Sequence, residues 1–136
     1  MQVILFANNT VGLGVAKRLR EAKTSIAAVV VHSAAAAKRR EEIVEASGVP
    51  PEHVFEGTTL SDPAVIAAIR DLRPEMGVSS FFGHLLRTPV LELFPRGVIN
   101  LHPSYLPFNR GHSPNVWSII DGTPAGVSLH FVDAGV

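Results

Sequence analysis

The sequence predicts an α/β fold whose sheet is largely parallel. Short apolar segments alternate with longer stretches of helical periodicity along the 136 residues, as in chains built from strand–helix–strand units. The apolar segment at 26–31 is continuous rather than alternating, which is typical of a strand covered on both faces. A chain of this length forms one domain with a substantial core.

The expected strands are short segments rich in apolar residues and bounded by turn residues. In chain order they lie at residues 3–7, 26–31, 54–55, 76–81, 98–101 and 127–132. Parallel sheets bind ligands beyond the carboxyl ends of their strands. The residues that follow these segments are therefore the first candidates for function.

The expected helices fall between the strands, at residues 11–21, 34–46, 61–72, 89–94 and 114–121. In the first of them, Val11, Val15 and Leu19 recur at helical spacing. The second is rich in Ala, Lys, Arg and Glu, which favour helices, and a Gly-Val-Pro-Pro sequence ends it. Ser61 is expected to cap the third helix, with Pro63 in its first turn.

The composition excludes several classes of function. The chain has no cysteine, so disulfides, thiolate metal sites and cysteine nucleophiles are all excluded. Twelve basic and twelve acidic side chains give zero net charge, which argues against a broad basic surface for nucleic acid. No apolar run approaches the ~20 residues of a membrane helix, and no charged leader precedes the first strand. We therefore expect a cytoplasmic protein with no membrane partner.

The turn after the first expected strand offers three polar candidates for substrate binding: Asn8, Asn9 and Thr10. The Gly12-Leu13-Gly14 sequence that follows resembles the start of a dinucleotide-binding motif. A lysine occupies the third glycine position, however, and no acidic residue ends the second strand. Free backbone N–H groups at the helix start could hold an anion, and a plain tight turn is the alternative.

Asn100 and His102 stand two residues apart at the carboxyl end of the fifth strand, so their side chains project to the same side. A neutral imidazole can accept a proton from an attacking amine, and an asparagine N–H can donate to an oxyanion. The two residues are therefore candidate catalytic groups for acyl transfer. The alternative is a pair that stabilises a loop through backbone hydrogen bonds.

Three prolines and one glycine make the loop at 103–114 rigid and irregular. Its aromatic and arginine side chains beside the candidate catalytic pair favour contact with a substrate, and a stiff connector is the alternative. The candidates for substrate contact are Tyr105, Asn109, Arg110 and Gly111. On the helix that follows, Val116 and Trp117 are expected in the core.

The segment 79–87, Ser-Ser-Phe-Phe-Gly-His-Leu-Leu-Arg, follows the fourth expected strand. Gly83 permits close backbone approach, so this apolar loop could hold a flat ring. The alternative, which the pattern alone favours, is a hydrophobic loop packed on the core.

Six histidines require a test for metal binding. His102, His112 and His130 are near one another in the sequence, but none has a helical i, i+4 partner with an acidic neighbour. No Gly-x-Ser-x-Gly turn is present, so a serine hydrolase is not supported either. We therefore expect no catalytic metal.

Residues 97–107, Gly-Val-Ile-Asn-Leu-His-Pro-Ser-Tyr-Leu-Pro, resemble the motif of the folate-dependent formyltransferases. This family includes the glycinamide ribonucleotide, methionyl-tRNA and sugar N-formyltransferases. The match continues through Gly111, Pro114 and residues 119–122 and 126–131. The resemblance implies a Rossmann-like fold and one formyltransferase-like catalytic domain at 1–136.

The resemblance also implies 10-formyltetrahydrofolate as the formyl donor and a small-molecule primary amine as the acceptor. In the family the Asn and His of Asn-x-His are catalytic, and Asn100 and His102 match them. Two backbone segments form the family's folate pocket. The matching residues are Phe82, Gly83, His84, Leu85 and Leu86, with Leu91 nearby, and then Phe131, Val132 and Asp133.

The family's third catalytic residue is an aspartate in a segment like Asp-x-Gly-Leu-Asp-Thr-Gly. Residues 133–136 match only its start, so the catalytic aspartate would follow Val136 and is not Asp133. The last strand has no covering element after it, and an uncovered edge invites association. We therefore expect a domain that is incomplete at its C-terminal end and weak or inactive by itself. Its open edge could form a homodimer.

The stretch 109–118 looks like the one found in sugar N-formyltransferases, so the expected acceptor is a nucleotide-linked amino sugar. Methionyl-tRNA formyltransferases more often carry a different sequence after the Arg-Gly pair, and zero net charge argues mildly against a tRNA partner. The alternatives are methionyl-tRNA formylation, hydrolysis of formyltetrahydrofolate, and a non-catalytic folate-binding or interaction module.

Overall fold

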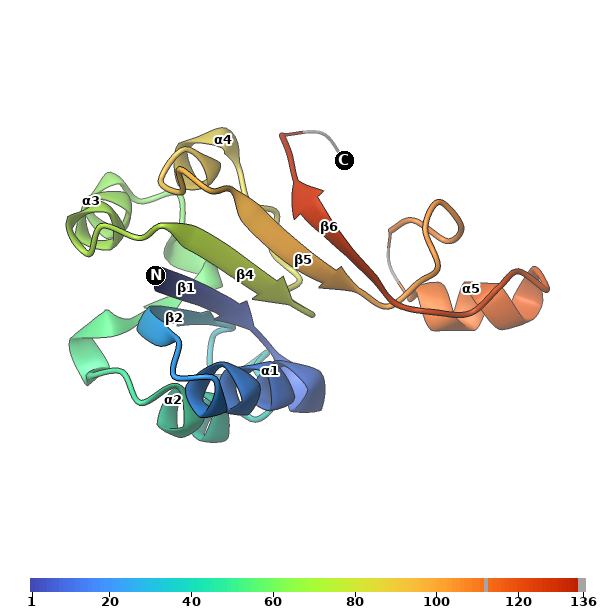
Figure 1. The fold of residues 1–136 in the computed structure, drawn as a ribbon, viewed down its shortest axis with the longest axis horizontal. Coiled ribbons are helices and arrows are strands. Elements are labelled where there is room, and N and C mark those ends of the chain that lie inside the picture. The colour runs from blue at the N-terminus through green and yellow to red at the C-terminus, as the bar shows by residue number, and fades with distance from the viewer. Residues whose placement is uncertain (112, 135–136) are drawn as a thin grey trace.

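The computed structural model describes residues 1–111 and 113–134, which form a six-stranded sheet flanked by helices (Figure 1). The strands are β1 (Gln2–Ala7), β2 (Ser25–Val31), β3 (Val54–Glu56), β4 (Met76–Ser80), β5 (Val98–His102) and β6 (Ser128–Val132). The helices are α1 (Asn9–Glu21), α2 (Arg40–Ser47), α3 (Pro63–Asp71), α4 (Thr88–Leu91) and α5 (Pro114–Ile120), with the 3-10 helices η1 (Pro51–His53) and η2 (Gly57–Thr59). The predicted α/β class is confirmed. The predictions for His112, Gly135 and Val136 lie outside the described residues.

The strand order is β3-β2-β1-β4-β5-β6. All neighbouring pairs are parallel except β5 and β6, which are antiparallel. The chain starts in the middle of the sheet, moves outward through β2 and β3, and then returns to build the other half from β4. The order therefore reverses between β1 and β4, and open α/β sheets bind ligands beyond the carboxyl ends of their strands at such a point. No helix in the described part of the chain is long and apolar enough to cross a membrane.

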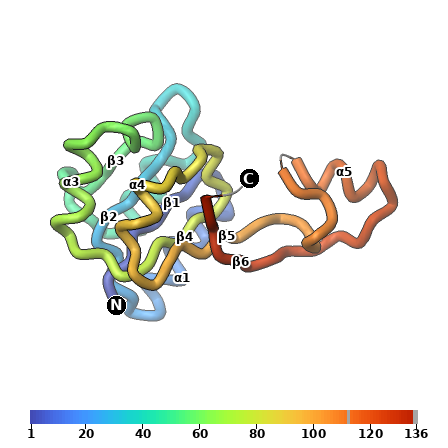
Figure 2. Tube along the Cα trace, turned by 90° about the horizontal axis from the view of Figure 1, so that it is seen from above, coloured from blue at the N-terminus to red at the C-terminus, as the bar shows by residue number. Residues whose placement is uncertain are grey.

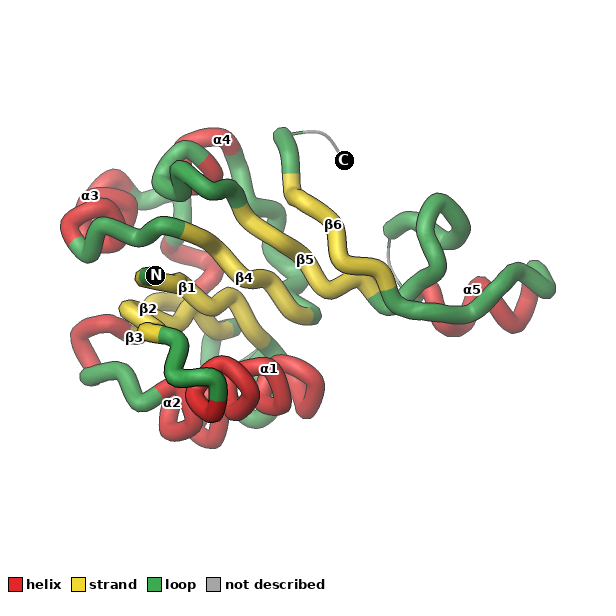
Figure 3. The backbone as a smooth tube through the Cα atoms, viewed as in Figure 1, coloured by secondary structure: helices red, strands yellow, loops and turns green. Residues whose placement is uncertain are grey.

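β1 lies at the centre of the molecule because both of its faces are covered. Its residues 3–7 are fully buried. Ile4 and Phe6 belong to a core that includes residues of α3 and α4, while Leu5 and Ala7 belong to a second core with α1 and α2. Figure 3 shows these two pairs of helices on opposite sides of the sheet. A strand buried in this way requires the continuous apolar sequence from which it was predicted.

Two helix predictions are wrong at their N-terminal ends. The helix expected at 34–46 begins only at Arg40, because the segment before it is tied to the start of α1. There the Asn8 side chain accepts the Lys38 N–H at 2.8 Å, and the Lys38 carbonyl accepts the Asn9 N–H at 3.0 Å.

The cap of α3 is Asp62 rather than Ser61. Pro63 takes the first helical position, so the residue directly before it becomes the cap. The Asp62 carboxylate accepts the Ala64 N–H at 2.8 Å, which satisfies one of the free donors of the first turn.

α5 and its flanking loops extend away from the sheet (Figures 1 and 2). Val116 and Trp117 are 55% and 50% exposed, so the prediction that they belong to the core is wrong. The buried residues of α5 are instead Pro114 and Ser118. Further apolar side chains are exposed on the same helix and on β6: Ile119, Ile120, Leu129 and Phe131.

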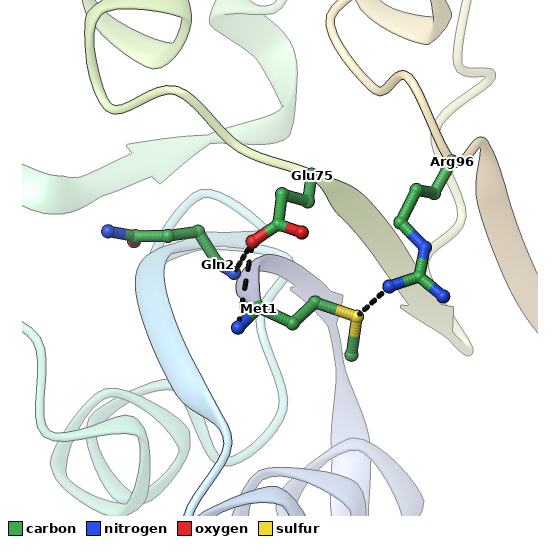
Figure 4. A network of polar contacts seen from close by, with 4 residues as sticks. All are labelled: Met1, Gln2, Glu75 and Arg96. Carbon is green, nitrogen blue, oxygen red and sulfur yellow. Dashed lines mark hydrogen bonds and ion pairs between the residues drawn. The ribbon is translucent and has the colours of Figure 1, made fainter.

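The amino ends of β1 and β4 are joined by the Glu75 carboxylate (Figure 4). This carboxylate accepts the Gln2 backbone N–H at 2.9 Å and pairs with the Met1 ammonium at 3.5 Å. Arg96 donates to the Met1 sulfur at 3.4 Å. The Gln2 N–H is the largest cause that lowers the pKa of Glu75, and the ammonium and Arg96 act in the same direction. These contacts link β1 to the start of β4 at the end of the sheet opposite the candidate ligand-binding edge.

Candidate functional site

The carboxyl ends of β1, β4 and β5 bring three of the predicted segments to one edge of the sheet. Ala7 pairs with Ser80, and Ser80 pairs with Leu101. The turn at Asn8, the loop after β4 and the end of β5 at His102 therefore meet at this edge.

A cavity of about 640 Å³ opens at the same edge. One wall is the apolar loop of residues 81–85, and a second consists of residues 100–103 of β5 and its loop. Gly111 and residues 113–116 complete the lining. Apolar walls with a few convergent polar groups, here Asn100 and His102, are typical of small-molecule sites.

Asn100 pairs with His130 of the neighbouring strand β6. Its Nδ2 lies 3.2 Å from Nε2 of His130. Because an amide nitrogen only donates, the imidazole accepts at Nε2 and carries its proton on Nδ1, which lies 2.9 Å from the Phe131 carbonyl oxygen. The Asn100 amide has two N–H groups, so it can keep this bond and donate the second N–H to a ligand.

The His102 imidazole has one long contact with the proline-rich loop. Its Nε2 lies 3.4 Å from the Asn109 carbonyl oxygen, a distance longer than most N–H···O bonds, so this partner is readily exchanged. His102 also lies near His130, with 6.1 Å between the ring centroids.

Polar contacts fix the proline-rich loop against β6 and the segment before it. The Asn109 side chain donates to the Thr123 hydroxyl at 2.6 Å. Ser128 donates to the Ser104 carbonyl at 2.8 Å and accepts the Leu106 N–H at 3.1 Å. Among the predicted substrate residues of this loop, Gly111 lines the cavity, while Tyr105 and Arg110 are exposed.

The backbone around the cavity is unusual at Phe81, Asn109 and Ser113. These residues have φ angles of 53°, 53° and 54°, in the left-handed region that side chains other than glycine rarely adopt. Phe81 and Ser113 both line the cavity.

The turn at the start of α1 uses two of its three polar side chains internally. Asn8 accepts the Lys38 N–H, and the Asn9 side chain accepts the Val11 N–H at 2.8 Å. Gly12 is buried, and a Cβ there would lie 3.0 Å from Cβ of Ala7, so this glycine serves the close packing of α1 on β1. Substrate binding by Asn8, Asn9 and the exposed Thr10 stays a prediction.

The predicted folate-contacting residues fall into three groups. Those that line the cavity are Phe82, Gly83, His84 and Leu85. Those that belong to the core or pack against it are Leu86, Leu91 and Val132. Those that are exposed are Phe131 and Asp133. The first segment is therefore the one that lies beside Asn100 and His102.

His130 is the polar neighbour of Asn100 and His102, and its position in the sequence suggested only a test for metal binding. The sequence feature that could have identified His130 is the alternation of side chains along β6, where Leu129 and Phe131 are exposed and His130 is half-buried. Within residues 1–111 and 113–134, no group of three or more acidic or histidine side chains could hold a metal ion.

The whole chain, residues 1–136, matches the model of the family described as formyl transferase. The methionyl-tRNA formyltransferase of Chloroflexus aggregans is 41% identical over 92 residues, which is 67% of this chain and 29% of that protein. The corresponding protein of Roseiflexus sp. is 43% identical over 88 residues, 64% of this chain and 26% of that protein. The chain therefore spans less than a third of the length of these two curated relatives.

Solved structures of other formyltransferases share the fold. Glycinamide ribonucleotide transformylase 1 from Symbiobacterium toebii has a TM-score of 0.79 at 23% identity, covering 100% of this chain and 68% of that chain. A sugar N-formyltransferase from Shewanella sp. has a TM-score of 0.70 at 21% identity, covering 100% of this chain and 52% of that chain. Because the family match includes every residue and these folds agree, the expected resemblance is confirmed, and the chain belongs to the formyl transferase family.

Proposed function

We propose that this chain carries the Asn–His pair of an N-formyltransferase that moves a formyl group from 10-formyltetrahydrofolate to a primary amine. The observation that carries this proposal is the position of Asn100 and His102 in the wall of an apolar cavity at the carboxyl edge of the sheet. The family match supplies the reaction class.

The residues present fit a folate donor. The wall at 81–85 has two phenyl rings, one imidazole and one leucine, which suit the face of a flat ring, and Gly83 allows close backbone approach. The cavity volume of about 640 Å³ is in the range of small-molecule and cofactor sites. When bound, the donor supplies a formyl carbonyl carbon that an amine can attack.

Asn100 and His102 then have complementary roles. As the carbonyl oxygen becomes negative, the second N–H of Asn100 donates to it. Neutral His102 accepts a proton from the attacking amine and returns a proton to the departing nitrogen. One C–N bond forms, one C–N bond breaks, and the proton transfers balance without oxidation or reduction.

Two acceptors have support. The stretch 109–118 resembles sugar N-formyltransferases and favours a nucleotide-linked amino sugar, whereas the two methionyl-tRNA formyltransferases above favour the amine of methionyl-tRNA. Incubation of the full-length gene product with donor and each acceptor separates these cases. Release of formate without any amine would instead assign the hydrolytic alternative.

We expect the chain of residues 1–136 to bind a stable analogue of 10-formyltetrahydrofolate in a calorimetric titration. The reason is that the walls at 81–85 and 100–103 both lie within it. A C-terminally extended chain is titrated beside it. If neither protein binds the analogue, the folate assignment is wrong, whereas binding by the extended chain alone would show that residues 1–136 do not form the whole pocket.

His102→Ala is expected to lower formyl transfer by the full-length product about 10²-fold while analogue affinity stays within about twofold. A loss of this size lies at the low end of the range for an acid–base group. The measurement is steady-state turnover beside the analogue titration. His53→Ala, which removes a histidine of η1 that does not line the cavity, is the control. Loss of affinity without loss of turnover number would make His102 a structural residue.

A further inference from the structure

His32 follows β2 directly and reaches across the edge of the sheet to the cavity wall. Its Nε2 accepts the backbone N–H of Gly83 at 3.1 Å, although the two residues are 51 positions apart. Gly83 lies in the middle of the wall at 81–85, between Phe82 and His84. The bond therefore holds the wall's backbone at one defined point.

The His32 ring also contacts both side chains that flank Gly83. Its centroid lies 5.5 Å from that of Phe82 and 4.7 Å from that of His84, and the Phe82 and His84 rings are 5.1 Å apart. Gly57 forms the floor of this cluster: a Cβ there would overlap the His84 ring and lie 2.8 Å from Cζ of Phe82. The three rings are thus packed around the Gly83 backbone.

The backbone of His32 is itself fixed. Its carbonyl oxygen accepts Nη1 of Arg40 at 2.6 Å, and the same guanidinium pairs with the Glu56 carboxylate at 3.1 Å. Glu56 is the last residue of β3 and directly precedes Gly57. Groups from β3 and α2 therefore fix the backbone of the residue whose imidazole holds Gly83.

We propose that His32 is a positioning residue for the donor-binding wall at 81–85, which its neutral imidazole fixes and its protonation releases. This inference rests on the proposed function, because it assigns that wall to the folate donor. His32 does not line the cavity, so it acts through Gly83.

The bond requires a lone pair on Nε2, and protonation turns both ring nitrogens into donors. The charged and titratable groups around His32 are His84 from the loop, Arg40 from α2 and Glu56 from β3. Burial, and next the charge of His84, lower the pKa of His32 below its ordinary value of 6.5. Neutral His32 therefore stabilises the folded chain fully above about pH 6.5, the ordinary pKa of the group. This stabilisation is lost as the pH falls through the lower pKa that His32 has in the folded chain.

Two substitutions separate the hydrogen bond from the ring packing. His32→Gln places an acceptor oxygen near the position of Nε2 and cannot titrate, whereas His32→Phe keeps an aromatic ring and loses the acceptor. His53→Gln removes a histidine of η1, before β3, and controls for general effects of histidine loss.

The first readout needs no ligand. In the wild-type chain and in His53→Gln, we expect the Gly83 amide resonance to shift with the His32 imidazole resonances as the pH falls below 6.5, and in His32→Gln we expect this shift to be reduced to the part that follows the His84 imidazole. A Gly83 amide that does not follow His32 overturns the inference.

The second readout is affinity for the stable 10-formyltetrahydrofolate analogue. At pH 7.5, His32→Phe is expected to bind about tenfold more weakly than wild type, and His32→Gln within about twofold. The ratio of the wild-type to the His32→Gln affinity is expected to fall as the pH decreases, and this ratio cancels the titration of the other histidines. Equal affinities of wild type and His32→Phe overturn the positioning role. No binding by any variant, with the Gly83 shift intact, contradicts the proposed function instead.

Discussion

Asn100→Ala is expected to lower the rate of formyl transfer by the full-length gene product ~10²–10³-fold, the typical loss when one oxyanion donor is removed. Asn100 is half-buried in the cavity wall, and its Nδ2 reaches His130 at 3.2 Å with a second N–H left to donate. Because the oxyanion forms only in the transition state, the loss should fall on turnover and leave analogue affinity nearly unchanged.

The matched variant is Asn100→Asp, which keeps the shape of the side chain and replaces both N–H donors with an acceptor. It should lose at least as much turnover as Asn100→Ala, since a carboxylate repels the developing oxyanion. Initial rates at saturating donor and acceptor measure both variants. Near-normal turnover in either one would remove the oxyanion role from Asn100.

Phe6→Ala is expected to lower the free energy of unfolding by about 3–5 kcal/mol. Phe6 is fully buried in β1, and its ring lies 5.5 Å from that of Phe82 and 5.9 Å from that of Phe94. A loss of this size is a large part of the ~5–15 kcal/mol that stabilises a typical domain. It should also loosen the cavity wall, because Phe82 lies in that wall.

Urea unfolding followed by circular dichroism measures the loss caused by Phe6→Ala. Phe131→Ala is the matched control: it removes the same ring from a position that is 66% exposed, and we expect a change within about 0.5 kcal/mol. Equal losses from the two variants would contradict the assignment of Phe6 to the core.

The buried strands were predictable because their sequence alone reports burial on both faces. The first strand was expected at 3–7 and is Gln2–Ala7, and the expected 26–31 is Ser25–Val31. Helical composition could not locate the start of α2, since the bond from Lys38 to Asn8 connects residues 30 positions apart. Periodicity likewise located α5 in the sequence, but it does not show which elements cover the helix. Val116 and Trp117 were therefore wrongly assigned to the core.

The candidate site was predictable to the extent that its chemistry lies within one short segment. Asn100 and His102 share a strand, so their alternation placed them together. Their neighbour His130 arrives only through the antiparallel pairing of β6 with β5, and the contact of His32 with Gly83 spans 51 positions. Contacts of this kind depend on the strand order, which the pattern of apolar residues does not specify.

The burial of β1 on both faces has a consequence for amide hydrogen exchange. We expect amide protons in β1 and its neighbours β2 and β4 to exchange only when the whole domain opens, and those of β6, whose apolar side chains are exposed, to exchange through local opening. The site spans both expected regimes, because the loop that carries Gly83 follows β4 and His130 belongs to β6. We therefore expect the bond between Asn100 and His130 to break and re-form many times for each opening of the strands that support the cavity wall.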